Sequence, residues 1–270
     1  MKRTWKKLIL RIKHESFREK VYLWFKDQNP YGFWEKNGLT IIAYVRDWPK
    51  DPYPDYIIES FREEEADENW VEEWQKRFKP IEVENTIRIR PPWEPSSSFL
   101  IDLVIYPAYA FGTGDHPTTF CCLKFIVHYL KPGMSFLDVG MGSGILSLLA
   151  VRLGAGEVTS IDIDPLAIEE LKRNCHFNQI PFERIHAKTG DLSGVKGSYD
   201  FIVANIGKQF LLENLSILSR MLNISGYIVL SGYQVGDSLL IQGISQSQNL
   251  WLIESSHQEN WVTQIFQKKK

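Results

Sequence analysis

The 270-residue sequence predicts an α/β fold, in which a parallel sheet is covered by helices on both faces and follows a small N-terminal α+β domain. Two observations support this prediction. From residue 118 onward, short apolar segments of strand length alternate with segments of helix length, which is the pattern of a parallel sheet wrapped on both sides. The earlier residues instead group several strand-like segments with two helix-like ones, and the chain is long enough for two domains.

Residues 1–66 are expected to form the small α+β domain. Apolar residues alternate over residues 4–12, which predicts a strand, and recur at helical spacing over residues 14–28. The segment "GFWEKNGLTIIAYV" predicts a β-hairpin with an Asn-Gly turn. A helix is expected over residues 56–78. Its acidic run "EEEADENWVEE" is either a solvated face or a surface that attracts a basic partner.

Residues 67–110 are expected to link the two domains through the end of that helix and two alternating strands, which flank a proline- and serine-rich turn. Residues 111–270 are expected to form the second domain. Helices are predicted over 118–130, 143–153, 165–177, 208–222 and 235–247. Strands are predicted over 135–139, 157–161, 182–187, 199–204, 226–231, 249–256 and 260–267, the last two as an edge hairpin.

A glycine-rich turn joins the first predicted strand and helix of this second domain. Gly140, Gly142 and Gly144 read G-x-G-x-G, and the position of the third glycine differs from the dinucleotide fingerprint. A P-loop is excluded because no Gly-Lys-Ser/Thr ends the turn. Asp138, just before the turn, would repel a pyrophosphate but suits a ligand with ammonium and sulfonium charges. The turn therefore favours S-adenosylmethionine over a nicotinamide or flavin cofactor.

Two polar residues end predicted strands of the same sheet. Asp162 lies twenty-two residues after Gly140, where a carboxylate can accept hydrogen bonds from both hydroxyls of a ribose. Asp164-Pro165 is expected to begin the next helix as its N-cap and first residue. Asn205 ends the strand "DFIVAN", so it should lie along the same edge as Asp162, although an Asx turn is the alternative interpretation.

Composition and charge exclude several classes of protein. The formal net charge is −2, which predicts no general affinity for nucleic acid or membranes, and no segment approaches the roughly 20 apolar residues of a membrane-spanning helix. The three cysteines form neither a C-x-x-C motif nor an even disulfide framework, which favours a reducing cytoplasm. No metal site is expected, because Cys175-His176 has no partner pair and reads as a buried thiol on a helix.

Four segments together resemble the ribosomal protein L11 methyltransferases (PrmA-like): "AFGTGDHPTT", "LDVGMGSGIL", "LGAGEVTSIDIDPLAIEELKRN" and "DFIVANI". The resemblance covers roughly residues 69–267. It implies a Rossmann-like class I methyltransferase that uses S-adenosylmethionine and carries an N-terminal module for substrate recognition. The positions that match the cofactor-binding residues of the family are Thr119, Gly140, Asp162 and Asn205, together with Asp191, at a position that often contacts the adenine.

The activity implied by this resemblance is methyl transfer to amino groups, on lysine side chains or an N-terminal amine, of a basic protein such as a large-subunit ribosomal protein. Asn205 is the candidate for orienting the amine. Asp115 or His116 could accept the departing proton, although a loop-forming role is favoured for both. The segment Gly207-Lys208-Gln209 departs from the family after Asn205-Ile206 and leaves the acceptor open.

Three alternatives remain at this point: a methyltransferase for a small-molecule amine, a non-catalytic relative that only binds, and a nicotinamide-dependent oxidoreductase. We expect a cytoplasmic monomer with no nucleic-acid or membrane partner.

Overall fold

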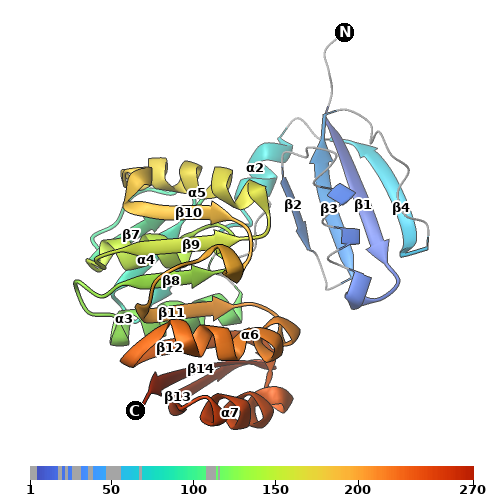
Figure 1. Ribbon diagram of the computed structural model, residues 1–270. Helices are drawn as coiled ribbons and strands as arrows, with labels where there is room; N and C mark the ends of the chain where they lie inside the picture. Colours follow the sequence, from blue (N-terminus) through green and yellow to red (C-terminus); the bar gives the residue numbers. More distant parts are fainter. Residues whose placement is uncertain are drawn as a thin grey trace. The chain divides into compact units, whose positions relative to one another are not determined.

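The structure is a computed structural model that describes residues 5–17, 20–21, 24–25, 32–35, 39–46, 56–66, 69–107, 114 and 116–270. The chain separates into two compact units (Figure 1). Residues 1–78 and 107–109 form the first unit, and residues 79–106 and 110–270 form the second.

The first unit is built on a four-stranded antiparallel sheet in the order β2-β3-β1-β4 (Figure 1). Its elements are β1 (Lys6–Ile12), a 3-10 turn (Glu15–Phe17), β2 (Gly32–Glu35), β3 (Thr40–Val45), β4 (Ile58–Glu65) and α2 (Trp70–Gln75). Alternation along β1 places Leu8, Leu10 and Ile12 in one buried cluster with Val45 of β3. The ring of Trp70 on α2 stacks on Tyr44 of β3 at 4.2 Å.

This sheet confirms the strand expected over residues 4–12 and the pairing of the two hairpin strands. The Asn-Gly turn lies outside the described residues, as do 7 of the 15 residues of the helix expected over residues 14–28. The described ones form the 3-10 turn Glu15–Phe17 and are helical at residues 20–21 and 24–25.

The helix expected over residues 56–78 is wrong in its first half, where the chain forms β4. This strand pairs with β1 along its whole length. Across the pair, Lys6 binds Glu63 at 2.5 Å and Lys7 binds Glu64 at 3.2 Å. The helix propensity of glutamate is worth only tenths of a kcal/mol per residue, so a ladder of backbone hydrogen bonds with opposite charges across it prevails. Two carboxylates of the acidic run, those of Glu63 and Glu64, thus lie on a strand and pair with lysines, while the attraction of a basic partner to the run stays a prediction.

The second unit contains a seven-stranded sheet in the order β10-β9-β8-β11-β12-β14-β13, in which only β14 runs against its neighbours (Figure 1). The strands are β8 (Phe136–Val139), β9 (Val158–Asp162), β10 (Ile185–Thr189), β11 (Tyr199–Asn205), β12 (Leu222–Gln234), β13 (Leu250–Gln258) and β14 (Trp261–Lys268). The edge hairpin is therefore confirmed. The strand expected from residue 182 begins at Ile185, after a 3-10 turn.

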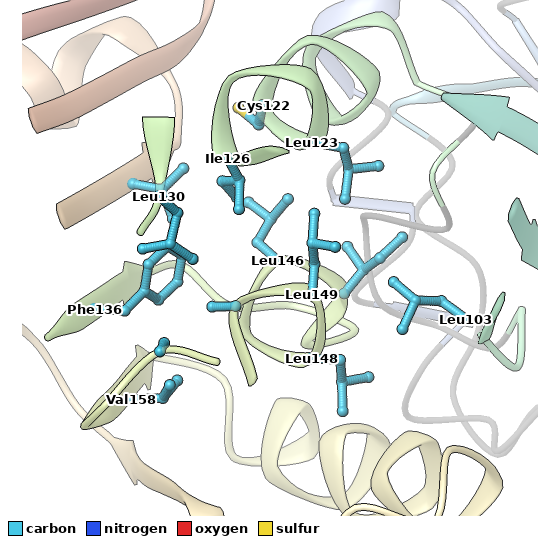
Figure 2. Close-up of a cluster of buried hydrophobic side chains, with 14 of the residues drawn as sticks. Leu103, Cys122, Leu123, Ile126, Leu130, Phe136, Leu146, Leu148, Leu149 and Val158 are labelled. Atoms are coloured by element: carbon cyan, nitrogen blue, oxygen red, sulfur yellow. The ribbon is translucent and has the colours of Figure 1, made fainter. Parts of the chain in front are cut away.

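Helices cover both faces of this sheet, which confirms the predicted fold class. They are α3 (Pro117–Tyr129), α4 (Ile145–Arg152), α5 (Pro165–Phe177), α6 (Lys208–Met221) and α7 (Ser238–Ser247). Residues of α3, α4 and α5 share one buried cluster, and residues of α6 and α7 share the other. Figure 2 shows part of the first cluster, where Ile126 of α3 and Leu146 of α4 lie beside one another. Each fully buried aliphatic side chain contributes about 1.5–3 kcal/mol.

A second, three-stranded sheet packs into the same cluster as α3 and α4. It consists of β5 (Ile81–Val83), β6 (Ile87–Arg90) and β7 (Ile101–Val104), with β5 antiparallel and β7 parallel to β6. The sequence predicted two strands in this segment. The extra division arises because Glu84 and Asn85 both adopt a positive φ, at 52° and 51°, and turn the chain back.

A bulge in β12 lies beside the end of β11. The register with β14 shifts between Ser231 and Tyr233, and Gly232 between them has a φ of 90°. A Cβ atom at Gly232 would lie 2.5 Å from the backbone oxygen of Ile206, the residue that follows Asn205. Glycine therefore allows the backbone after β11 to pass directly against β12.

We expect Gly232→Ala to lower the free energy of unfolding by about 1–3 kcal/mol, because the methyl group meets backbone that cannot move aside and the φ angle is strained for alanine. This corresponds to a fall in the thermal unfolding temperature of roughly 3–10 °C. Gly236→Ala is the matched control, since nothing lies within 4 Å of its added Cβ atom. Equal unfolding temperatures for the two variants would show that the close approach imposes no constraint.

Candidate cofactor and acceptor site

The carboxyl ends of three strands meet at the centre of the seven-stranded sheet. The strand order runs from β8 through β9 to β10 on one side and from β8 to β11 and β12 on the other. Such a reversal is the position at which open α/β sheets bind their ligands. In the register of the sheet, Val139 pairs with the residues that precede Asp162 and Asn205. Gly140, Asp162 and Asn205 therefore follow in one row along this edge.

The turn between β8 and α4 depends on its glycines. Gly140, Gly142 and Gly144 have φ angles of 75°, 49° and 77°, a backbone that other residues rarely adopt. A Cβ atom at Gly140 would lie 2.7 Å from the side chain of Ile206. The turn thus passes close to the segment that follows β11.

Asp162 shapes this turn as well as lying in the predicted ribose position. Its Oδ2 atom accepts a hydrogen bond from the backbone N–H of Gly142, and its Oδ1 atom accepts one from the N–H of Asp164, both at 2.9 Å. The role in holding the turn was not predicted from the sequence. The Asp164 carboxylate accepts from the N–H of Leu166 at 3.0 Å, with Pro165 as the first helical residue, which confirms the predicted N-cap of α5.

Asp138 lies beneath the turn and is only 1% exposed. Its Oδ2 atom accepts from the hydroxyl of Ser147 at 2.6 Å, and that hydroxyl lies 2.7 Å from the hydroxyl of Ser160. Its Oδ1 atom has no hydrogen-bond partner among the described residues. Burial raises the pKa of Asp138 to about 7, and the negative charge of Asp162 adds to this effect.

Sequence reasoning missed the two serines that support Asp138. The signal was present, since Ser147 stands in the apolar helix "ILSLLAVR" and Ser160 in the apolar strand "VTSID". A hydroxyl at a position that should be buried requires a hydrogen-bond partner.

Asn205 and Thr119 are brought together across β11 and the first turn of α3. The Nδ2 atom of Asn205 donates to the hydroxyl of Thr119 at 3.4 Å, and Thr119 is buried. The Oδ1 atom of Asn205 is buried and has no partner within the part of the chain that the structure describes. Because the NH₂ group is directed to Thr119, the carbonyl oxygen is the atom left to accept a hydrogen bond from a ligand.

The N-terminus of α3 uses His116 as its cap. The Nδ1 atom of His116 accepts from the backbone N–H of Thr118 at 3.3 Å, and its ring lies 5.1 Å from that of Trp261. These contacts support the loop-forming interpretation of His116. Asp115 and residues 108–113, which include most of the "AFGTG" segment, lie outside the described residues.

Asp191 lies at the same edge of the sheet, two residues beyond Thr189, which pairs with Asp162. Its Oδ1 atom accepts hydrogen bonds from both the backbone N–H and the hydroxyl of Ser193, and these hold the pKa of the Asp191 carboxyl below its ordinary value. Contact with the adenine stays a prediction for this residue.

The residues at this edge fit S-adenosylmethionine. Two buried oxygens, Asp138 Oδ1 and Asn205 Oδ1, lack a donor among the described residues. A buried polar atom without a partner costs about 1–3 kcal/mol, so a ligand that brings N–H groups or positive charge is favoured here. S-adenosylmethionine carries an ammonium and a sulfonium group and no phosphate, which matches this set of acceptors.

Neither a metal centre nor a membrane span is visible in the described part of the chain. No three His, Cys, Asp or Glu residues among those described are grouped so that they could hold a metal ion. Cys175 is buried, and burial raises the pKa of its thiol to about 11. None of the described helices is both long and apolar enough to cross a membrane.

Comparison with known proteins identifies relatives of the chain. The sequence model of the family described as "Ribosomal protein L11 methyltransferase (PrmA)" matches residues 47–269. The chain is 39% identical over 202 residues to the ribosomal protein L11 methyltransferase of Dictyoglomus thermophilum. The matched region covers 74% of this chain and 66% of that relative, which is just under two thirds of the relative's length. It is 32% identical over 270 residues to the protein of the same description from Dictyoglomus turgidum, covering 94% and 89%.

A solved structure leads to the same family. The ribosomal protein L11 methylase from Lactobacillus delbrueckii subsp. bulgaricus matches with a TM-score of 0.66 and 27% identity, over 71% of this chain and 99% of that one. The chain therefore belongs to the ribosomal protein L11 methyltransferase family, whose methyl donor is S-adenosylmethionine.

Proposed function

We propose that the protein transfers methyl groups from S-adenosylmethionine to amino groups of ribosomal protein L11. The observation that carries this proposal is the row of Gly140, Asp162 and Asn205, in which the unpartnered carbonyl oxygen of Asn205 lies on the strand next to the glycine turn. The names of the relatives support L11 as the acceptor. Family membership also argues against a nicotinamide-dependent oxidoreductase.

The side chains at the sheet edge divide the work of binding and alignment. Asp162 holds the ribose with the lone pairs that its bonds to Gly142 and Asp164 leave free, because a carboxylate accepts up to about four hydrogen bonds. Asp138 balances the ammonium group, and Thr119 fixes the amide plane of Asn205. The bound cofactor supplies a methyl group on a sulfonium that is already activated for displacement.

Asn205 orients the acceptor. Its Oδ1 atom accepts an N–H of the neutral amine, so that the nitrogen lone pair is directed at the methyl carbon. Transfer to this nitrogen would form the N–C bond as the S–C bond of the donor breaks, with the electron pair left on sulfur and one proton released from the nitrogen to solvent. Transfer of the amine into a dry site lowers its pKa and favours the neutral form. Alignment of this kind is worth about 7–11 kcal/mol of the barrier.

The three segments of the chain have separate roles in this proposal. Residues 1–66 recognise the acceptor protein, and residues 111–270 bind the cofactor and catalyse transfer. Residues 67–110 link these two parts of the chain. The separation of residues 1–78 into a unit with its own hydrophobic cluster supports an independent recognition module. The enzyme acts as a monomer in the cytoplasm, where ribosomal proteins are made, and needs neither nucleic acid nor membrane.

The test is transfer of label from methyl-labelled S-adenosylmethionine to purified L11, and to an extract of cells that lack an L11 methyltransferase. We expect label in L11, at lysine side chains or the N-terminal amine by mass spectrometry. Label in a small molecule with L11 unlabelled would favour the small-molecule amine. Cofactor binding without any transfer would favour a non-catalytic relative.

Asp162→Ala is expected to weaken S-adenosylmethionine binding at least tenfold, because charge-assisted hydrogen bonds worth about 1.5–3 kcal/mol are lost. Asp164→Ala is the matched control, since it removes the cap of α5 but not the proposed ribose contact. Calorimetric titration of both variants measures the dissociation constant. An unchanged constant in Asp162→Ala would place the ribose elsewhere.

A further inference from the structure

Two buried asparagines lie one turn apart at the end of α5, Asn174 in its last turn and Asn178 as its C-cap. Asn174 is 1% exposed and Asn178 is 2% exposed, so each amide must find its hydrogen-bond partners inside the protein. Both amides use their donor and their acceptor on backbone groups, and both bind the stretch from Val104 to Tyr106, but only Asn174 also binds the glycine turn, at Ser143. This difference separates a structural role from a functional one.

Asn178 completes the edge of a small sheet. Its Oδ1 atom accepts from the N–H of Val104 at 2.9 Å, and its Nδ2 atom donates to the carbonyl oxygen of Val104 at 2.6 Å. The same Nδ2 atom donates to the backbone oxygen of Asn174 at 2.7 Å. The side chain thus replaces the neighbouring strand that β7 lacks at its end, and it does not touch the glycine turn.

Asn174 instead joins two separate segments. Its Nδ2 atom donates to the carbonyl oxygen of Ser143 at 2.8 Å, and its Oδ1 atom accepts from the N–H of Tyr106 at 2.9 Å. Ser143 stands between Gly142 and Gly144 in the turn. Tyr106 follows β7, and from there the chain runs on to the α3 helix that carries Thr119.

A glycine turn needs an external support to hold one conformation. Its residues have few steric limits on φ and ψ, so a free turn would lose more conformational entropy when it orders around a ligand. A hydrogen bond that fixes the Ser143 carbonyl restricts the peptide plane between Ser143 and Gly144. Fixing this plane before the ligand arrives lowers the cost of binding.

We propose that Asn174 is a positioning residue that holds the cofactor-binding turn in its binding conformation and couples it to the backbone of Tyr106, just after β7. The inference rests on the cofactor site of the proposed function. It assigns to α5 a role in cofactor affinity beyond the packing of that helix on the sheet.

The test compares Asn174→Asp with Asn178→Asp by titration with S-adenosylhomocysteine, the demethylated product, and by thermal unfolding. In each variant aspartate keeps an acceptor for a backbone N–H but replaces the donor by an oxygen that faces a carbonyl. Because the two sites are on one helix and equally buried, we expect similar losses of unfolding temperature. Only Asn174→Asp should weaken product binding, by about tenfold.

Asn174→Ala and Asn178→Ala give the same comparison without a buried charge, should either aspartate variant fail to fold. Amide hydrogen exchange at Tyr106 provides a second measurement. Added product should slow this exchange in the wild-type protein and in Asn178→Ala, but not in Asn174→Ala.

Equal weakening of binding in the two variants, or no weakening in either, would overturn the inference and leave Asn174 as a packing residue. The inference would also be overturned if added product slowed amide exchange at Tyr106 in Asn174→Ala as much as it does in the wild-type protein. The experiment uses no acceptor protein. A wild-type protein that binds the product but does not methylate L11 would therefore refute the proposed acceptor and leave the role of Asn174 standing.

Discussion

Asn205→Ala is expected to lower the kcat of methyl transfer about 100-fold while changing the affinity for S-adenosylmethionine much less. The amide oxygen is proposed to hold the amine, and loss of alignment at the reacting atoms costs on the order of 10²-fold in rate. The cofactor keeps its other contacts, to the glycine turn and Asp162. Single-turnover rates with L11 and calorimetric titration of the cofactor measure the two quantities separately.

Two further variants show whether the amide acts through its orientation. Thr119→Val removes the hydroxyl that accepts from Asn205 Nδ2, so the amide can rotate and kcat should fall, whereas Thr119→Ser retains the hydroxyl and should preserve most of the activity. Asn214→Ala is the control for loss of an asparagine elsewhere, since its amide donates only to the backbone oxygen of Phe210 among the contacts described for it. A kcat in Asn205→Ala equal to that of the wild type would remove Asn205 from the mechanism.

Asp138→Asn is expected to weaken S-adenosylmethionine binding by roughly 10–100-fold at about pH 8 and to abolish its pH dependence. Burial raises the pKa of Asp138 from its ordinary value to about 7, so the carboxylate is charged above that pH. A cationic ligand interacts with the charged form, and wild-type affinity should therefore increase as the pH rises through about 7. Calorimetry between about pH 5.5 and 8.5 follows this change in both proteins.

The stability of the ligand-free protein should respond in the opposite direction. Between the unfolded pKa of about 4 and the folded pKa, only the folded state holds the Asp138 proton, so the free energy of unfolding falls as pH rises through this window. Asp138→Asn removes this pH-dependent loss of stability, because asparagine does not ionise. The variant should therefore unfold at a higher temperature than the wild type above about pH 7. If the variant binds the cofactor as tightly as the wild type at about pH 8, the ammonium group lies elsewhere.

The sequence predicted the second unit well because its elements are specified locally. Apolar segments mark each strand, and Asp164-Pro165 marks the start of α5. The row that contains Asp162 and Asn205 followed from a general rule about parallel sheets, which places the carboxyl ends of neighbouring strands together. The positions of these residues could therefore be predicted without knowledge of any side-chain contact.

The features that could not be predicted depend on partners far away in the chain. The glutamates of β4 are helix formers by themselves, and their strand conformation is decided by backbone pairing with β1, whose lysines 57 positions earlier bind them. The hydrogen bonds of Asn178, just after the predicted helix 165–177, depend on Val104, which is 74 positions away. The raised pKa of Asp138 likewise requires the depth of its burial, which the one-dimensional pattern does not contain.

The contacts of Ile206 have a consequence for how this protein can evolve. Two glycines approach the residue in different ways: Gly140, in the turn after β8, lies against its side chain, and Gly232, in β12, lies against its backbone. A shorter side chain at position 206 makes room for a methyl group at position 140, although the positive φ there still disfavours one. No substitution at position 206 makes room at position 232, because every amino acid has the same carbonyl oxygen. Whether a methyl group fits at position 140 therefore depends on the residue at position 206, whereas no residue at position 206 lets one fit at position 232.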